Sequence, residues 1–260
     1  MTPVVDLSHP LESGMTVFPG TPPASLEPTA TVKEAGYRTT GISIDSHTGT
    51  HIDAPAHMLA DGKHLEEYPL ERFQFDAAVA DCRPLEAREP IDAEMISAAL
   101  PGAVWGGSGS ESGDHGHRQS QGQGQGPGHD HDDQPLDSTL DLIVVRTGWE
   151  RYWNTDRYLE HPFLTPEAAQ WLVANGLNLG LDTLNPDPTS KPDSESTSQS
   201  SAATGYPVHH TLFAADRLIV ENLCGLEAVP ARFRLQTFPL SIVDADGAPI
   251  RAVGMIPEAD

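Results

Sequence analysis

The alternation of apolar and polar positions along the chain predicts several short strands. Residues 140–148 (LDLIVVRTG) form an apolar run that is rich in β-branched residues and ends at a glycine, which is typical of a buried strand. Residues 177–184 (LNLGLDTL) and 217–223 (RLIVENL) have the same character. Residues 233–256 predict further strands around an ADGAP turn.

One segment between these strands has the end signals of a helix. Residues 165–176 (TPEAAQWLVANG) place Thr165 at the N-cap, Pro166 in the first turn and Gly176 at the stop. Strand and helix signals therefore alternate, and we expect the mixed α/β class. The pattern leaves the order of the strands in the sheet open.

Two stretches interrupt the folded pattern. Residues 106–138 consist mostly of Gly, Ser, Gln, His and Asp, and residues 186–204 (PDPTSKPDSESTSQSSAAT) have a similar composition. Such segments have too little apolar surface to offset the entropy lost on folding. We expect a single domain over residues 1–260, with disordered surface insertions at 106–138 and 186–204.

The net charge narrows the range of partners. The chain has 38 acidic and 15 basic side chains, a formal net charge of −23, and only three lysines. Nucleic acids and anionic membranes are bound by clustered cations, so we expect neither as a partner. An acidic, lysine-poor surface suits a salt-rich cell interior, where screening weakens self-repulsion, and we interpret the chain as halophilic. No segment resembles a signal peptide or membrane span, so we expect a cytoplasmic location.

Residues 47–57 (HTGTHIDAPAH) concentrate the candidate chemistry of the chain. Read with the two-residue period of a strand, His47, His51 and Asp53 fall on one polar face. An ideal strand would hold the Cα atoms of the two histidines about 13 Å apart, at a rise of roughly 3.3 Å per residue. We therefore expect the chain to curl at Gly49 if both bind one ion.

Two interpretations of this stretch remain at the level of the residues alone. In one, two imidazoles and a carboxylate hold a metal ion and leave positions open for a substrate, with Pro55 turning His57 toward the same cavity. In the other, they are surface polar residues of a chain that contains twelve histidines. The concentration of histidine and aspartate favours the metal site.

Several blocks, in order, resemble one protein family. They are DLSHPLESGMTVFPGTPP at the N-terminus, HTGTHIDAPAH, VVRTGW (144–149), LGLDTLNPD (179–187) and PVHHTLFAADRLIVENLCGL. Together they resemble the metal-dependent cyclase-like hydrolases, which include bacterial kynurenine formamidase and isatin hydrolase. The resemblance implies a swivelling β/β/α fold. It also implies a homodimer and hydrolysis of a small-molecule amide.

The resemblance also implies the site residues. His47, His51, Asp53, His209 and Glu221 would bind one or two Zn²⁺ or Mn²⁺ ions, and His57 would be the catalytic proton donor and acceptor. A bound metal ion lowers the pKa of water and polarises a carbonyl, which agrees with amide hydrolysis. Phe18 stands where the formamidases carry a substrate-binding tryptophan, so it offers a face for stacking but no indole N–H.

The family leaves the substrate open. The best single expectation is an arylformamidase that converts N-formylkynurenine to kynurenine and formate. The rivals are a cyclic-amide or lactone hydrolase similar to isatin hydrolase, and a metal-binding protein without catalysis. The presence of His57 beside the expected ligands disfavours the last.

Overall fold

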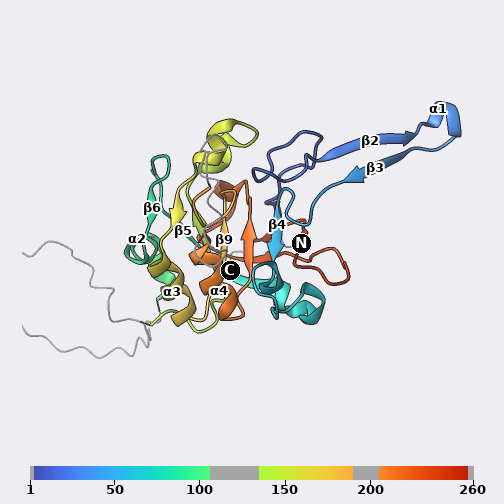
Figure 1. The fold of residues 1–260 in the computed structure, drawn as a ribbon. Helices are drawn as coiled ribbons and strands as arrows, with labels where there is room; N and C mark the ends of the chain where they lie inside the picture. The colour runs from blue at the N-terminus through green and yellow to red at the C-terminus, as the bar shows by residue number, and fades with distance from the viewer. Residues whose placement is uncertain (1–2, 106–134, 190–204, 257–260) are drawn as a thin grey trace, which may run out of the picture.

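The computed structural model describes residues 3–105, 135–189 and 205–256, which are built around one mixed sheet (Figure 1). In these residues the sheet has nine strands. Their order across the sheet is β1 (Val4–Asp6), β13 (Val253–Met255), β11 (Arg232–Gln236), β5 (Gln74–Asp81), β7 (Leu142–Arg146), β9 (Asn178–Leu181), β10 (Ile219–Glu221), β4 (His51–Asp53) and β12 (Gly247–Pro249). The four central strands, β5 to β10, run parallel to one another, and every other pairing in the sheet is antiparallel.

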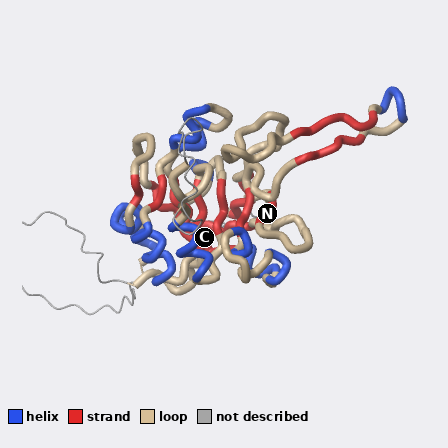
Figure 2. The backbone as a smooth tube through the Cα atoms, in the orientation of Figure 1, coloured by secondary structure: helices blue, strands red, loops and turns tan. Residues whose placement is uncertain are grey.

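Helices cover one face of the sheet. They are α2 (Ala93–Ala99), α3 (Pro166–Ala174) and α4 (Pro207–Ala214), and Figure 2 shows them beside the central strands. Alternate residues of the parallel strands, such as Ile143 and Val145, pack in the core beneath these helices. Their neighbours Leu142 and Val144 pack in a second core on the opposite face. Burial on both faces explains why these strands have continuous apolar sequences.

The structure confirms the α/β class and the elements expected from the pattern. Helix α3 begins after Thr165, whose side chain accepts a hydrogen bond from the backbone N–H of Ala168. The chain leaves the helix through Gly176 at φ +75°. Strands β7, β9 and β10 lie within the predicted apolar runs, and the segment 233–256 divides among β11, β12 and β13.

A two-stranded arm projects from the body (Figure 1). It consists of β2 (Ser25–Ala30), the short helix α1 (Val32–Ala35) and β3 (Thr39–Ser43). A second small sheet pairs β6 (Pro90–Ile91) with β8 (Phe163–Leu164). The remaining turns include short 3-10 helices: η1 (Pro55–His57), η2 (Leu65–Glu67), η3 (Leu70–Phe73), η4 (Gly102–Val104), η5 (Trp149–Tyr152), η6 (Asp156–Glu160) and η8 (Leu226–Ala228).

The predicted insertions lie mostly outside the described residues, but their edges do not. Residues 106–134 and 190–204 are not described. At the edge of the first, Leu136 forms a β-bridge with Trp105. At the edge of the second, Asp187 and Thr189 are buried. The predicted boundary at 186 is therefore wrong, because the polar groups of residues 186–189 have partners inside the fold that composition does not reveal.

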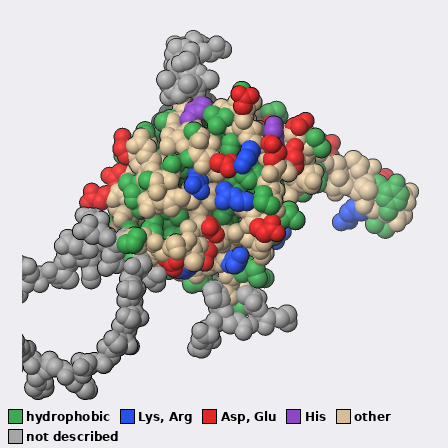
Figure 3. Space-filling model, turned by 90° about the horizontal axis from the view of Figure 1, so that it is seen from below, with side chains coloured by type: hydrophobic (Ala, Val, Ile, Leu, Met, Phe, Trp, Pro, Cys, Tyr) green, Lys and Arg blue, Asp and Glu red, His purple; other side chains and the backbone are tan. Residues whose placement is uncertain are grey.

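Cations and carboxylates share the surface. Figure 3 shows Lys and Arg side chains near the middle of one face, with Asp and Glu side chains around them. Several of the few cations form ion pairs, such as Arg232 with Asp76 and Asp137, and Arg251 with Asp6. Within the described ranges, no helix combines the length and the apolar character needed to span a bilayer.

Candidate metal centre and active site

The pairing of β4 with β10 brings three of the predicted ligands together. Strand β4 is only three residues long, and Ile52 at its centre enters the core while His51 and Asp53 face the other way. Glu221 is the cross-strand partner of His51. The His51 Nε2 atom lies 3.2 Å from Asp53 Oδ1 and 3.3 Å from Glu221 Oε2. All three side chains are buried.

A turn, and not a continuous strand, delivers His47 to this group. Strand β3 ends at Ser43, and β4 begins at His51, so residues 44–50 lie between two separate strands. Thr48 closes the turn, because its Oγ1 accepts from the backbone N–H of Asp45 at 2.9 Å. The predicted curl at Gly49 is confirmed by its φ of +70°. His47 Nδ1 consequently lies 2.7 Å from Asp53 Oδ1.

The neighbouring strand β12 leaves just enough room for the His47 ring. A Cβ atom at Gly247 would lie 2.5 Å from His47 Cε1, so only glycine fits there. The preceding residue, Asp246, places its Oδ2 atom 3.0 Å from His47 Nε2 and 3.4 Å from His57 Nδ1. The ADGAP segment therefore contributes a strand and a site carboxylate as well as a turn. Asp246 was not among the predicted site residues.

Helix α4 supplies the last predicted histidine. His209 lies in its first turn, with Nε2 3.3 Å from Glu221 Oε1. Its Nδ1–H donates to Asp187 Oδ2 at 2.6 Å. Asp187 also accepts from the backbone N–H groups of Val208 and His209, so it orients the ring and caps the helix. Sequence reasoning missed Asp187 because it lies in a stretch assigned to an insertion, although it belongs to the LGLDTLNPD block.

The buried polar atoms of the site fit a divalent cation. His51 donates Nδ1–H to the carbonyl of Gly49, which fixes the tautomer that leaves Nε2 as an acceptor. In the described residues, His51 Nε2, Asp53 Oδ2 and Glu221 Oε1 are buried without a hydrogen-bond partner. Buried polar groups normally have one, and a cation bound by all three side chains would satisfy these atoms together.

The spacing of the donor atoms agrees with this conclusion. Two ligands of a tetrahedral ion at bond lengths of about 2.0–2.1 Å lie roughly 3.3 Å apart. The contacts from His51 Nε2 and His209 Nε2 to the carboxylates measure 3.2–3.3 Å. Three overlapping sets of donor atoms could hold an ion: His47, His51 and Asp53; Asp53, His209 and Glu221; and His47, His57 and Asp246.

Neighbouring charges shift the pKa values of the site residues. Burial alone lowers the pKa of His47, but the Asp53 and Asp246 carboxylates outweigh it and raise that pKa to about 9. Burial likewise lowers the pKa of His209, while Asp187 and Glu221 raise it to about 10. The pKa of Asp53 is held well below its ordinary value by the two adjacent histidines, despite burial. A metal ion would therefore displace protons that His47 and His209 hold at neutral pH.

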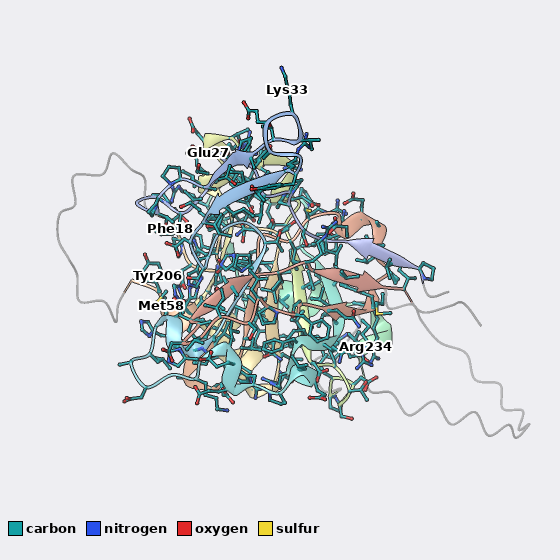
Figure 4. The ribbon with its side chains drawn as sticks, turned by 90° about the vertical axis from the view of Figure 1, so that its right-hand side faces the viewer. Phe18, Glu27, Lys33, Met58, Tyr206 and Arg234 are labelled. Atoms are coloured by element: carbon teal, nitrogen blue, oxygen red, sulfur yellow. The ribbon has the colours of Figure 1, made fainter. Side chains whose placement is uncertain are left out.

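A cavity of about 360 Å³ opens onto these residues. Apolar side chains, among them Phe18, Met58 and Tyr206, form part of its lining, and Figure 4 shows these three on one side of the molecule. His57 also lines the cavity from η1, and its ring centroid lies 3.9 Å from that of His47. The structure thus places Phe18, His57 and all the predicted ligands except the buried Asp53 along one cavity, with Asp53 directly behind His47 and His51.

Comparison with known proteins finds relatives that match along almost the whole chain. A kynurenine formamidase of Bacillus cytotoxicus is 25% identical over 252 residues, covering 96% of this chain and 95% of that protein. A kynurenine formamidase of Geobacillus thermodenitrificans is 26% identical over 259 residues, covering 97% of each chain. These relatives are hydrolases of similar length.

Solved structures share the fold. Isatin hydrolase A from Labrenzia aggregata, bound to benzyl benzoate, superposes with a TM-score of 0.72 at 24% identity, covering 99% of this chain and 94% of that one. A potential metal-dependent hydrolase with cyclase activity gives a TM-score of 0.64 at 23% identity, covering all of both chains. The family model "Putative cyclase" matches residues 5–104 and 131–188, more than half of the sequence. The chain therefore belongs to the cyclase family that this model defines.

Proposed function

We propose that this protein is a metal-dependent hydrolase that cleaves an amide C–N bond in a small aromatic substrate. The observation that carries the proposal is the set of buried, unpartnered donor atoms on His51, Asp53 and Glu221, which lie beside a substrate-sized cavity. Isolated buried carboxylates and imidazoles are costly unless a charge partner completes them. A family of hydrolases with related sequences supports the same assignment.

The residues divide the work by position. His47, His51, Asp53, His209 and Glu221 would hold one or two ions, Zn²⁺ or Mn²⁺ being the two whose ligand preferences suit this set. The bound metal would supply Lewis-acid polarisation of the amide carbonyl and a ready source of hydroxide at neutral pH. Asp187 and the carbonyl of Gly49 engage the Nδ1 atoms of His209 and His51, which would leave both Nε2 atoms available as metal ligands.

We assign the proton transfers to His57. The η1 turn that begins at Pro55 brings His57 back toward the other histidines. There it lines the cavity but is not buried among them. From there its imidazole can take a proton from the attacking water and pass one to the leaving nitrogen. The Asp246 carboxylate, 3.4 Å from His57 Nδ1, favours a ring orientation that leaves Nε2 for this task.

N-formylkynurenine is the substrate we propose first, with kynurenine and formate as products. The relatives named kynurenine formamidase support it, and Phe18 provides an aromatic face at the cavity for the substrate ring. We further propose that the enzyme acts as a cytoplasmic homodimer, which light scattering of the purified protein would test.

Metal-dependent turnover tests the function directly. Purified protein is stripped with a chelator, reloaded with Zn²⁺ or Mn²⁺, and assayed with N-formylkynurenine at low and high salt. We expect activity only after reloading, and a loss of about 10²–10⁴-fold in kcat for His57→Ala with its metal content unchanged. If the protein hydrolysed only isatin or a lactone, that compound would replace N-formylkynurenine as the proposed substrate. Metal binding without turnover of any of them would reduce the protein to a metal-binding role.

A further inference from the structure

The charged side chains in the described lining of the cavity are carboxylates and histidines. Its lining includes Asp45, Glu221 and Asp246, together with four histidines and apolar or neutral side chains, but no lysine or arginine. A carboxylate on the substrate would therefore find no lysine or arginine to pair with in the described lining. The charge of the lining depends on these particular residues, and not on the net charge of the whole chain.

Cations on adjacent segments are engaged elsewhere. Lys63, whose carbonyl accepts from Ala56 next to His57, pairs through its Nζ atom with Asp216 at 2.9 Å. Arg88 donates to the backbone carbonyl of Thr189 at 2.9 Å. Recruiting either one to a bound carboxylate would require it to give up these contacts.

Asp45 is the lining carboxylate that is free to contact a substrate. Glu221 and Asp246 belong to the sets of possible metal donors, whereas Asp45 belongs to none of them. Two hydrogen bonds to Thr48 fix its backbone: its N–H donates to Thr48 Oγ1, and its carbonyl accepts from the Thr48 N–H. Its side chain is solvent-exposed and accepts only from the hydroxyl of Ser46 among the hydrogen bonds of the described residues.

The same cavity contains independent signs of a ligand. His51 Nε2 and Glu221 Oε1 are buried, lack hydrogen-bond partners and belong to residues that line it. The reacting amide group would lie toward these atoms, so the rest of a substrate that enters from solvent extends toward the exposed Asp45. The acidic mouth thus faces the part of the substrate that does not react.

Resting on the proposed function, we propose that Asp45 selects substrates by charge at this non-reacting end. Aryl amides with an ammonium group or no charge there are accepted, and those with only a carboxylate are disfavoured. A zwitterionic side chain fits when its ammonium group faces Asp45 and its carboxylate points to solvent. Two unit charges about 5 Å apart in a water-like medium change binding roughly fourfold, and more in the less polar mouth of a cavity.

Three formanilides that differ only at the para position test the selection. They carry an aminomethyl group, a hydroxymethyl group or a carboxylate, and kcat/KM is measured for each with metal-loaded protein at about 0.1 M salt, where screening is moderate. We expect kcat/KM to be higher for the aminomethyl compound than for the carboxylate. Asp45→Asn should reduce the ratio of these two kcat/KM values about tenfold, since attraction of the cation and repulsion of the anion are lost together. The matched control is Glu27→Gln, which removes the same charge from the arm (Figure 4) and should leave the ratio unchanged.

Binding measurements separate this inference from the hydrolase proposal. Calorimetry with benzylammonium and benzoate reads the charge preference even if no formanilide is hydrolysed, and comparing metal-free with metal-loaded protein identifies any benzoate that binds the ion itself. A ratio that Asp45→Asn leaves unchanged, or changes no more than Glu27→Gln does, would overturn the role of Asp45. Failure to hydrolyse the neutral formanilide, with the calorimetric preference intact, would count against the proposed function alone.

Discussion

Asp187 offers the sharpest test of how the metal centre is held. Its Oδ2 atom accepts from His209 Nδ1 at 2.6 Å and from the His209 backbone N–H at 3.1 Å, and its Oδ1 atom accepts from the Val208 N–H at 3.0 Å. The side chain is fully buried. Replacing it with asparagine keeps the volume but removes the negative charge and one of the two acceptor oxygens.

The expected size of the effect follows from these three bonds. Asparagine can turn its carbonyl oxygen toward His209, but its NH₂ group then faces the Val208 N–H, and one buried donor loses its partner. Such a loss costs about 1–3 kcal/mol of unfolding free energy. His209 also loses the carboxylate that makes it a stronger ligand, and changes of this kind typically weaken metal affinity about 10–100-fold.

The assay measures both quantities in the same protein. Metal affinity is measured by competition with a chromophoric chelator, and stability is measured by denaturant unfolding of the metal-free form. The control is Asp92→Asn, because Asp92 caps α2 through the Met95 N–H and takes no part in the site. It should lose some stability while it keeps its metal affinity. If Asp187→Asn lost stability but bound metal as tightly as the unsubstituted chain, Asp187 would be a helix cap and nothing more.

Three further expectations follow from the same geometry. Gly247→Ala should weaken metal binding at least tenfold, because the added Cβ would lie 2.5 Å from His47 Cε1. Gly102→Ala is the control, because a Cβ there meets open space and should leave the metal affinity unchanged. Equal metal affinities for the two variants would contradict this prediction. Metal binding at pH 7 should release protons, because the pKa values of His47 and His209 are about 9 and about 10, and metal affinity should therefore rise with pH. Calorimetry in two buffers of different ionisation enthalpy counts the released protons. A count of zero would refute this prediction. Burial lowers the pKa of His161 to about 4, so the unfolded chain, with an ordinary pKa near 6.5, binds the proton first as the pH falls. Stability should therefore drop by roughly 3 kcal/mol between pH 6.5 and 4 relative to His161→Gln, as denaturant unfolding at each pH would show.

The motif at residues 47–57 illustrates how far local pattern reaches. Its residues occur close together in sequence, so their types and the glycine between them predicted a curled segment, and the structure contains one at Gly49. The two-residue period placed His47, His51 and Asp53 on one face, but it did not reveal what shapes the chain between His47 and His51. The Thr48 side chain closes a turn there, a local hydrogen bond that competes with strand pairing and leaves no trace in hydrophobic periodicity.

The partners of the motif required more than local pattern. His209 and Glu221 came from the resemblance to a family, and the structure places both beside His51 and Asp53. Asp187 was hidden by composition, because a polar, proline-rich stretch looks the same whether its carboxylate is solvated or is satisfied by the start of a helix. Burial depends on which donors the rest of the chain presents, and composition does not contain that information.

The sequence by itself determined the fold class, the positions of the apolar strands and of α3, and the residue types that could bind a metal. These depend on short-range periodicity and on end signals that act within a few residues. Only the tertiary structure decided that Asp246 lies beside His47 and His57, which are far from it in sequence. The pairing of β12 with β4 sets that contact, and the register of two distant strands depends on packing across the whole sheet.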